Sequence, residues 1–151
     1  MLNIYVDADA CPVKKEIFRV AMRHNLQVYL VSNSCLNIVV DANVHKIQVK
    51  SDQDAADDWI EEHIETGDIV VTTDILLAER CLKKGVSTIS PAGKVFNNDN
   101  IGVAKAMRGL RAYLREAGIA PSYNATFSKQ DRSRFLQVLE ETIQAIKRHH
   151  N

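Results

Sequence analysis

Short apolar runs alternate with longer amphipathic stretches along most of this sequence. Five of the short runs are rich in β-branched residues and are bounded by polar or turn-forming residues, which predicts buried strands. These runs lie at residues 3–6, 26–31, 46–49, 68–72 and 86–89. Residues 36–40 have a weaker pattern, which fits either a further short extended segment or one helical turn.

Apolar residues that recur at helical spacing predict five helices. They span residues 13–24, 53–66, 75–84, 101–117 and 128–148. Pro12 suits the first turn of the first helix. Ser51 and Asp52 supply an N-cap before the second helix. Ser128 and Asp131 have the spacing of a capping box, which opens the last helix.

Strands that alternate with helices predict an α/β fold, in which a mostly parallel central sheet is flanked by helices on both faces. The 151 residues suffice for one such domain with its own core and leave little room for a second. Residues 90–100 contain proline, glycine and several asparagines and are predicted to be a loop, and residues 119–126 are predicted to be a connector. The whole chain, residues 1–151, is therefore expected to form a single domain.

Charge is balanced over the whole chain but not between its two parts. The chain has 19 basic and 19 acidic residues, which excludes a globally basic nucleic-acid binder and an acidic solvating tail. Residues 1–100 carry 15 acidic and 10 basic side chains, whereas residues 101–151 carry 4 acidic and 9 basic ones. The first part is suited to bind cations and the second to bind anions, although two solvated faces that attract each other would give the same counts.

The cysteines and the N-terminus indicate a cytoplasmic protein. The three cysteines are odd in number and form no CxxC pair, so we expect reduced thiols rather than disulfides or a zinc ribbon. The N-terminus reaches a charge at Asp7 before the apolar region of a signal peptide could form. Every apolar run is far shorter than a membrane span, so no membrane association is expected.

Aspartates fall at the ends of several predicted elements. Asp7 and Asp9 follow the first strand, and Asp74 follows the strand at residues 68–72. Because the carboxyl ends of parallel strands form one edge of the sheet, Asp7 and Asp74 are expected to be close if their strands are neighbours. Asp54 and Asp57 are three positions apart in the first turns of the second helix and are expected to share a face.

A group of carboxylates without basic partners would bind a divalent cation. Mg²⁺ and Mn²⁺ favour carboxylate oxygens and water, and such a site can activate water against a phosphodiester. The predicted metal ligands are Asp7, Asp9, Asp54, Asp57 and Asp74. The alternative is structural, with Asp9 and Asp74 as helix N-caps and the remaining aspartates as surface charges, since Asp is a preferred cap residue.

Several of these motifs together resemble the YaiI/YqxD family of small bacterial proteins, which has no established activity. The resemblance begins with the string Val-Asp-Ala-Asp-Ala-Cys-Pro at residues 6–12 and includes Ala-Asp at residues 56–57. It continues through residues 71–78, 91–93 and 127–132, so it covers nearly the whole chain. The Asp-Ala-Asp-Ala-Cys-Pro segment is its most specific marker.

The same residues also resemble the wider PIN-like nuclease fold, in which acids at the first strand end, on a central helix and in a Thr-x-Asp motif hold Mg²⁺ or Mn²⁺. The resemblance implies a single PIN-like domain and assigns the catalytic acids to Asp7, Asp57 and Asp74. It further implies a metal-dependent nuclease that acts on RNA, or less readily on single-stranded DNA. Asp9 and Asp54 would then hold a second metal ion or orient the attacking water.

Substrate contacts are expected from residues near the proposed site and from a basic helix face. Lys14 and Lys15 open the helix beside Asp9, and Ser32 and Asn33 follow the second strand. A second set of basic candidates lies in the last third of the chain, where the first four form a stripe at steps of three and four: Lys105, Arg108, Arg111, Arg115 and Arg132. A solvated helix face is the alternative interpretation of this stripe.

Two other functions compete with the nuclease. The Asp7–Asp9 spacing resembles the nucleophile motif of haloacid-dehalogenase-like phosphatases, with Asp7 as nucleophile and Asp9 as acid, but Cys11 stands where that motif has Thr or Val. The chain could also bind metal or RNA without cutting. Dinucleotide binding is disfavoured, because no GxGxxG or GxxxxGK[ST] segment follows a predicted strand.

Overall fold

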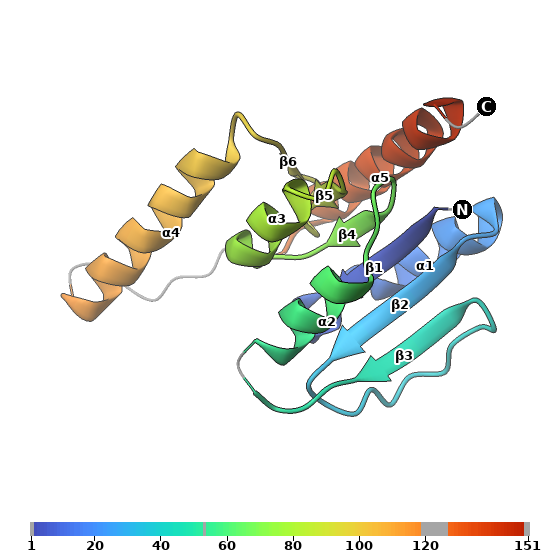
Figure 1. Cartoon of the computed structure of the whole chain (residues 1–151), viewed down its shortest axis with the longest axis horizontal. Helices are drawn as coiled ribbons and strands as arrows, with labels where there is room; N and C mark the ends of the chain where they lie inside the picture. Colours follow the sequence, from blue (N-terminus) through green and yellow to red (C-terminus); the bar gives the residue numbers. More distant parts are fainter. Residues whose placement is uncertain (1, 53, 119–126, 150–151) are drawn as a thin grey trace.

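One mixed sheet forms the centre of the structure, a computed structural model that describes residues 2–52, 54–118 and 127–149 (Figure 1). Its strands are β1 (Asn3–Asp7), β2 (Gln27–Ser32), β3 (Val44–Gln48), β4 (Ile69–Val71), β5 (Ser87–Ile89) and β6 (Val95–Phe96). They lie in the order β3-β2-β1-β4-β5-β6, and all neighbours are parallel except β5 and β6. The predicted single α/β domain with a mostly parallel sheet is thus confirmed.

Helices cover both faces of this sheet. They are α1 (Lys14–His24), α2 (Ala55–His63), α3 (Ile75–Leu82), α4 (Ile101–Glu116) and α5 (Lys129–His149), with a short 3-10 turn, η1 (Ala8–Ala10), after β1. α1 and α5 pack on one face, and α2 and α3 pack on the other. α4 projects away from the sheet and packs mainly against α3 and β6 (Figure 1).

The central strands are buried on both faces, which explains their almost continuous apolar sequence. On β1, Ile4 and Val6 face the core shared with α1 and α5, whereas Tyr5 faces the core shared with α2 and α3. From α5, Phe135 and Leu139 are completely buried against the first face. Because the amphipathic helices supply both outer layers, the charged side chains of the domain gather at the edges of the sheet and on the outer helix faces.

The structure differs from the sequence prediction in three places. The predicted loop at 90–100 contains the short strand β6, which pairs antiparallel with the edge strand β5 and is too short to show a periodic pattern. Residues 36–40 form neither strand nor helix, although Leu36, Ile38 and Val40 pack against the core and, of the apolar side chains, only Val39 is fully exposed. The second helix is shorter than predicted and begins at Ala55. The predicted connector at 119–126 lies outside the described residues.

The capping box at the start of α5 is confirmed. The backbone N–H of Asp131 donates to Ser128 Oγ at 3.1 Å, and the backbone N–H of Ser128 donates to Asp131 Oδ2 at 3.0 Å. The pKa of Asp131 is lowered, and the hydrogen bond from the backbone N–H of Ser128 is the largest cause. Reciprocal bonds of this kind satisfy two backbone donors that have no partner within the helix.

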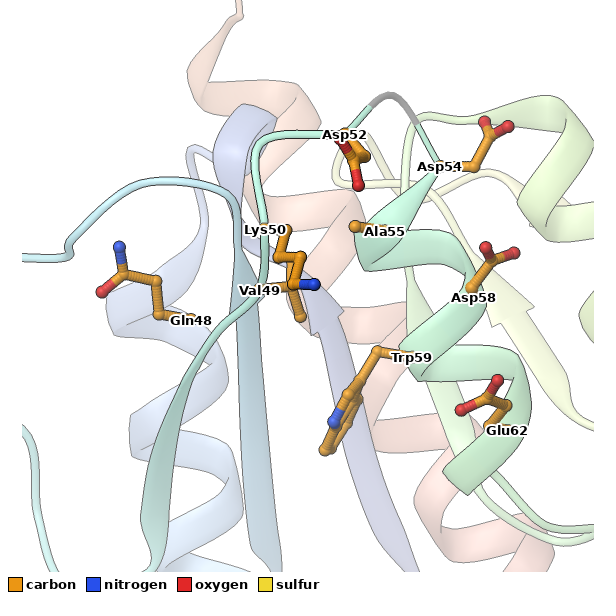
Figure 2. Close-up of a pocket in the computed structure, with 9 residues that line it drawn as sticks. All are labelled: Gln48, Val49, Lys50, Asp52, Asp54, Ala55, Asp58, Trp59 and Glu62. Carbon is orange, nitrogen blue, oxygen red and sulfur yellow. The ribbon is translucent and has the colours of Figure 1, made fainter.

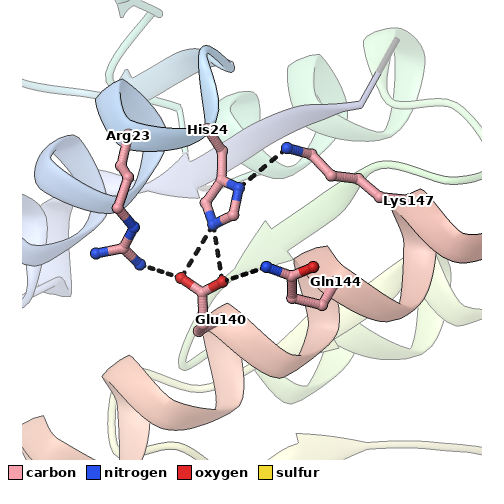
Figure 3. Close-up of polar contacts among 5 residues, drawn as sticks. All are labelled: Arg23, His24, Glu140, Gln144 and Lys147. Atoms are coloured by element: carbon pink, nitrogen blue, oxygen red, sulfur yellow. Dashed lines mark hydrogen bonds and ion pairs between the residues drawn. The ribbon is translucent and has the colours of Figure 1, made fainter.

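A polar cluster near the C-terminal end of α5 fastens that helix to α1 (Figure 3). Glu140 accepts hydrogen bonds from Arg23, from His24 Nε2 at 2.8 Å and from Gln144 Nε2 at 2.9 Å. Lys147 Nζ lies 3.0 Å from His24 Nδ1 on the other side of the ring. The hydrogen bond from His24, followed by that from Gln144, lowers the pKa of Glu140 to about 2.

The Glu140→Gln variant is expected to lose roughly 1 kcal/mol of stability at pH 7, the usual size of a partly exposed ion pair. Since the pKa of Glu140 is lower in the folded chain than in the unfolded one, its stabilisation is present above pH 4.5 and is lost as the pH falls towards 2. Urea unfolding at pH 7 and pH 3 measures this, with Glu141→Gln on the exposed side of α5 as control. A stability difference that is the same at both pH values would contradict the assignment.

Candidate functional site

Two of the predicted site residues meet at the carboxyl edge of the sheet. Asp7 ends β1, and Asp74 lies three residues beyond β4, the strand that pairs with β1. Thr72 stands between them, since its Oγ1 donates to Asp7 Oδ2 at 3.0 Å and accepts from the backbone N–H of Asp74 at 3.0 Å. The two strands are therefore neighbours, as expected, and the hydroxyl of Thr72 links the ends of β1 and β4.

Asp74 is also the N-cap of α3. Its Oδ1 accepts hydrogen bonds from the backbone N–H groups of Leu76 at 2.9 Å and Leu77 at 3.3 Å. The structural interpretation of this aspartate as a helix cap is therefore correct. Only Oδ1 is used for this cap, so the second carboxylate oxygen of Asp74 is not occupied by the backbone of α3.

Asp57 supplies a third carboxylate from the first turn of α2. Its side chain is buried, and burial, the charge of Asp74 and a hydrogen bond shared with the Asp74 carboxyl raise its pKa to about 7. The charge of Asp7 raises it further, whereas Arg80 lowers it. Two carboxyl groups can share a hydrogen bond only when one of them carries a proton, so this pair takes up one proton as the pH falls through about 7.

Asp7, Asp57 and Asp74 form what we call the acidic centre. Burial raises the pKa of Asp7, the hydrogen bond from Thr72 opposes this, and the charges of Asp74 and Asp9 add to the increase. The Arg80 guanidinium, whose charge acts on Asp57, donates its hydrogen bonds to Asp58 and Glu61 of α2 instead. The three carboxylates thus repel one another, and a proton or a bound cation would relieve the repulsion.

Asp9 is engaged in a separate network. It accepts hydrogen bonds from Ser32 Oγ, from the backbone N–H of Asn33 at 2.9 Å and from Ser34 Oγ at 3.2 Å. Burial acts to raise the pKa of Asp9, but these hydrogen bonds and nearby Lys14 lower it overall. Ser32 and Asn33, predicted to contact substrate, are therefore used in this structure to hold Asp9 and to fix the turn after β2.

Asp54 lines a groove to which Asp7, Asp57 and Asp74 do not contribute. α2 begins at Ala55, so Asp54 is the N-cap residue of this helix, and its backbone carbonyl accepts a hydrogen bond from the backbone N–H of Asp58 at 2.9 Å. The expected common face of Asp54 and Asp57 stays a prediction. Asp54 is exposed, and the groove that it lines together with Trp59 has a volume of about 560 Å³ (Figure 2). The other acidic side chains of that groove are Asp52, Asp58 and Glu62.

Lys14, Lys15 and Arg132 lie around a groove of about 420 Å³ beside α1. Lys14 Nζ donates to the carbonyl oxygen of Cys11 at 2.9 Å. Arg132 is paired with the buried carboxylate of Glu16, and its guanidinium lies 5.2 Å from the ring centre of Phe127. Arg132 therefore holds α5 against α1. Cys11 is a buried thiol, as expected, and burial raises its pKa to about 11.

Arg108 lines a further groove of about 410 Å³, between α4 and the segment that begins α3. Thr73, the residue before Asp74, lines the same groove. The structure thus brings three of the basic candidates, Arg108, Arg111 and Arg115, to the same groove as the residue before Asp74. Thr72 and Ser34 were not among the predicted site residues. Thr72 is the threonine of the Thr-x-Asp motif, which is the signal that could have identified it, whereas the only signal for Ser34 is a hydroxyl close to Ser32 and Asn33 in the chain.

The donor chemistry of the acidic centre suits a hard divalent ion, because it consists of carboxylate oxygens. In the described part of the chain, no three histidine, cysteine, aspartate or glutamate side chains are arranged as a group that could hold a metal ion. Asp7, Asp57 and Asp74 are therefore coupled by charge rather than assembled into a finished ligand shell. Within the same residues, no helix combines the length and apolar character needed to cross a membrane.

The fold and this edge of the sheet define an α/β protein with carboxylates at the ends of adjacent parallel strands. The family model DUF188, described as "Uncharacterized BCR, YaiI/YqxD family", matches residues 5–145. A UPF0178 protein of Rhodospirillum rubrum is 52% identical over 148 residues, which cover 97% of this chain and 99% of the relative. Another, from Rhizobium meliloti, is 51% identical over 145 residues, with 96% and 99% covered. The chain belongs to the YaiI/YqxD family. No solved structure matches it.

Proposed function

We propose that the chain is a nuclease that depends on a divalent cation, with RNA as the expected substrate and the acidic centre as its catalytic site. The observation that carries this proposal is that three carboxylates from three separate elements, Asp7, Asp57 and Asp74, interact closely enough to shift pKa values. Their order along the chain resembles the PIN-like pattern, with an acid ending the first strand, an acid on a helix and a Thr-x-Asp segment. These features support hydrolysis of a phosphodiester.

The roles follow from the surroundings of each carboxylate. Asp7 and Asp74 would hold Mg²⁺ or Mn²⁺, which when bound polarises a phosphoryl oxygen. Asp57 completes the site, and with a pKa of about 7 it accepts a proton from water near neutral pH. Thr72 keeps Asp7 oriented through its 3.0 Å hydrogen bond. Asp9, whose pKa is lowered, is suited to hold the turn after β2 in place.

The test is a calorimetric titration with Mn²⁺ followed by an assay on labelled RNA and labelled single-stranded DNA. The wild type is compared with Asp7→Asn and Asp74→Asn. Both variants are expected to bind Mn²⁺ more weakly and to cut at least about 100-fold more slowly, which corresponds to roughly 3 kcal/mol of transition-state stabilisation. The exposed Asp99, which lies in the loop before α4, gives the control variant Asp99→Asn, with no expected change.

The other outcomes identify the competing functions. Equal Mn²⁺ affinity in the wild type and in both variants would eliminate the acidic centre as a metal site. Mn²⁺ binding without cleavage would indicate a protein that binds metal or RNA without catalysis. A phosphate trapped on Asp7 would indicate the phosphatase. That reaction requires Asp9 to donate a proton, whereas the hydrogen bonds from Ser32, Asn33 and Ser34 keep it ionised.

A further inference from the structure

The groove between α4 and the start of α3 is strongly basic. Four of its lining residues are cations, Lys94, Arg108, Arg111 and Arg115, and no acidic residue lines it. The three arginines recur at steps of three and four, so they project from one side of α4. An uninterrupted group of four positive charges along one groove favours an anionic ligand that itself has repeated charges.

The groove cations are not used for internal ion pairs. Among the described residues, none of the four forms a salt bridge. Lys105, on the same helix, shows the contrast, because its Nζ lies 3.2 Å from Glu79 of α3 and fastens the two helices together. The cations of the groove are thus held near one another without nearby negative charge. Their mutual repulsion lowers the stability of the fold unless a bound ligand supplies that negative charge.

Apolar side chains lie among these cations. Val103 is 66% exposed and Met107 is 41% exposed, and both line the groove, with Phe96 forming part of its wall. Exposed apolar atoms between arginines suit a ligand that offers bases as well as phosphates. A single strand presents both, whereas a duplex hides its base faces in the stack.

The groove also opens beside the acidic centre. Thr73 and Ile75, the residues on either side of Asp74 in the chain, both line it, so the groove runs along the segment that carries Asp74. We propose that this groove binds the phosphate backbone of a single-stranded nucleic acid and directs the strand towards Asp74. Binding by the groove is independent of catalysis, whereas delivery of the strand for cleavage rests on the proposed function.

The test measures binding of fluorescently labelled oligouridylate and oligothymidylate, each about 12 nucleotides long, by anisotropy over a range of salt concentrations. EDTA is present throughout, so that no metal-dependent cleavage contributes. The test variant is Arg108→Gln/Arg111→Gln/Arg115→Gln, in which glutamine preserves helix propensity. A control variant, Arg19→Gln/Lys83→Gln/Arg148→Gln, removes the same charge from exposed positions outside the groove.

Loss of three phosphate contacts is expected to reduce the slope of log affinity against log salt by about 2, since each contact to a single strand contributes about 0.7. The affinity at 0.15 M salt should fall by more than about tenfold for both RNA and DNA, because the backbone is the shared ligand. The control variant should stay within about twofold of the wild type. Circular dichroism checks that α4 is still helical in each variant.

Three results would overturn the proposal: unchanged binding by the test variant, an equal loss in the control variant, and no binding by the wild type at low salt. If the wild type does not bind, sedimentation is the next measurement. A dimer would then assign Val103 and Met107 to an interface between two copies of the chain instead of a nucleic-acid groove. Failure of the nuclease function is a different result. If Asp7→Asn binds the oligonucleotides normally and the wild type never cuts them, the groove stands without the proposed activity.

Discussion

Replacing Asp57 by asparagine is expected to make the protein more stable while eliminating metal-dependent cleavage. Asparagine keeps the shape of the protonated carboxyl and can donate to Asp74, but it removes one of three charges that repel one another. A raised pKa of about 7, against 3.8 for a free aspartate, means that the ionised form is disfavoured in the folded chain. Functional sites often contain charges whose removal stabilises the fold at the cost of activity.

The gain should depend on pH in a defined direction. Because the pKa of Asp57 is higher in the folded state, its favourable contribution is complete below about pH 3.8 and is lost as the pH rises through 7. Asparagine suffers no such loss. The variant should therefore exceed the wild type by roughly 2 kcal/mol at pH 8, after allowance for solvent screening, and by much less at pH 5.

Urea unfolding in EDTA at pH 5 and pH 8 measures this difference, and the cleavage assay on the same samples measures the activity. Asp58→Asn is the matched control, because Asp58 is the next residue of α2, is exposed and pairs with Arg80 at 2.8 Å. That change should cost between about 0 and 1 kcal/mol. If Asp57→Asn is less stable than the wild type at pH 8, the carboxylates do not repel one another as described.

Replacing Gly93 by alanine should destabilise the domain by at least about 3 kcal/mol, which corresponds to a melting temperature lower by roughly 10 °C. Gly93 has a φ of +88°, where an L residue is strained. An added Cβ would also lie 2.8 Å from the backbone carbon of Arg134 and 2.8 Å from the backbone nitrogen of Phe135. Those atoms belong to α5, and Phe135 is completely buried, so the helix cannot move aside without disturbing the core.

Gly109→Ala provides the comparison for this prediction. Gly109 lies in the middle of α4, and an added Cβ there would meet nothing within 4 Å. Alanine should therefore favour the helix by about 0.5–1 kcal/mol. Thermal unfolding of both variants decides the matter, and a Gly93→Ala protein that melts with the wild type would mean that the loop does not pack on α5 as observed.

Elements that are fixed by interactions between residues close in the sequence could be predicted, and elements that depend on distant partners could not. The start of α5 could be predicted because Ser128 and Asp131 satisfy each other within four residues. The strand β6 could not, because its two residues are ordered by pairing with β5 rather than by a pattern of their own. Residues 36–40 have strand-like composition but no neighbouring strand to pair with, so their backbone is irregular.

The candidate site shows the same division. The nearness of Asp7 and Asp74 could be expected from strand ends, provided that β1 and β4 are neighbours. That Asp54 is the N-cap residue of α2 rather than part of the helix depends on where the helix begins, and the predicted helix began two residues earlier. The use of Asp9 by Ser32 and Ser34 could not be predicted, because the partners come from a turn more than twenty residues away.

The sequence by itself determined the α/β class, the five helices, the five parallel strands and the family, because each depends on periodicity, caps or motifs that are local in the chain. Tertiary structure alone decided that burial and the charge of Asp74 raise the pKa of Asp57, that Arg132 is paired with Glu16, and that the arginines of α4 line the same groove as Thr73. The physical reason is that pKa values and ion pairs depend on the distances between groups and on burial. Both are set only when distant segments pack together.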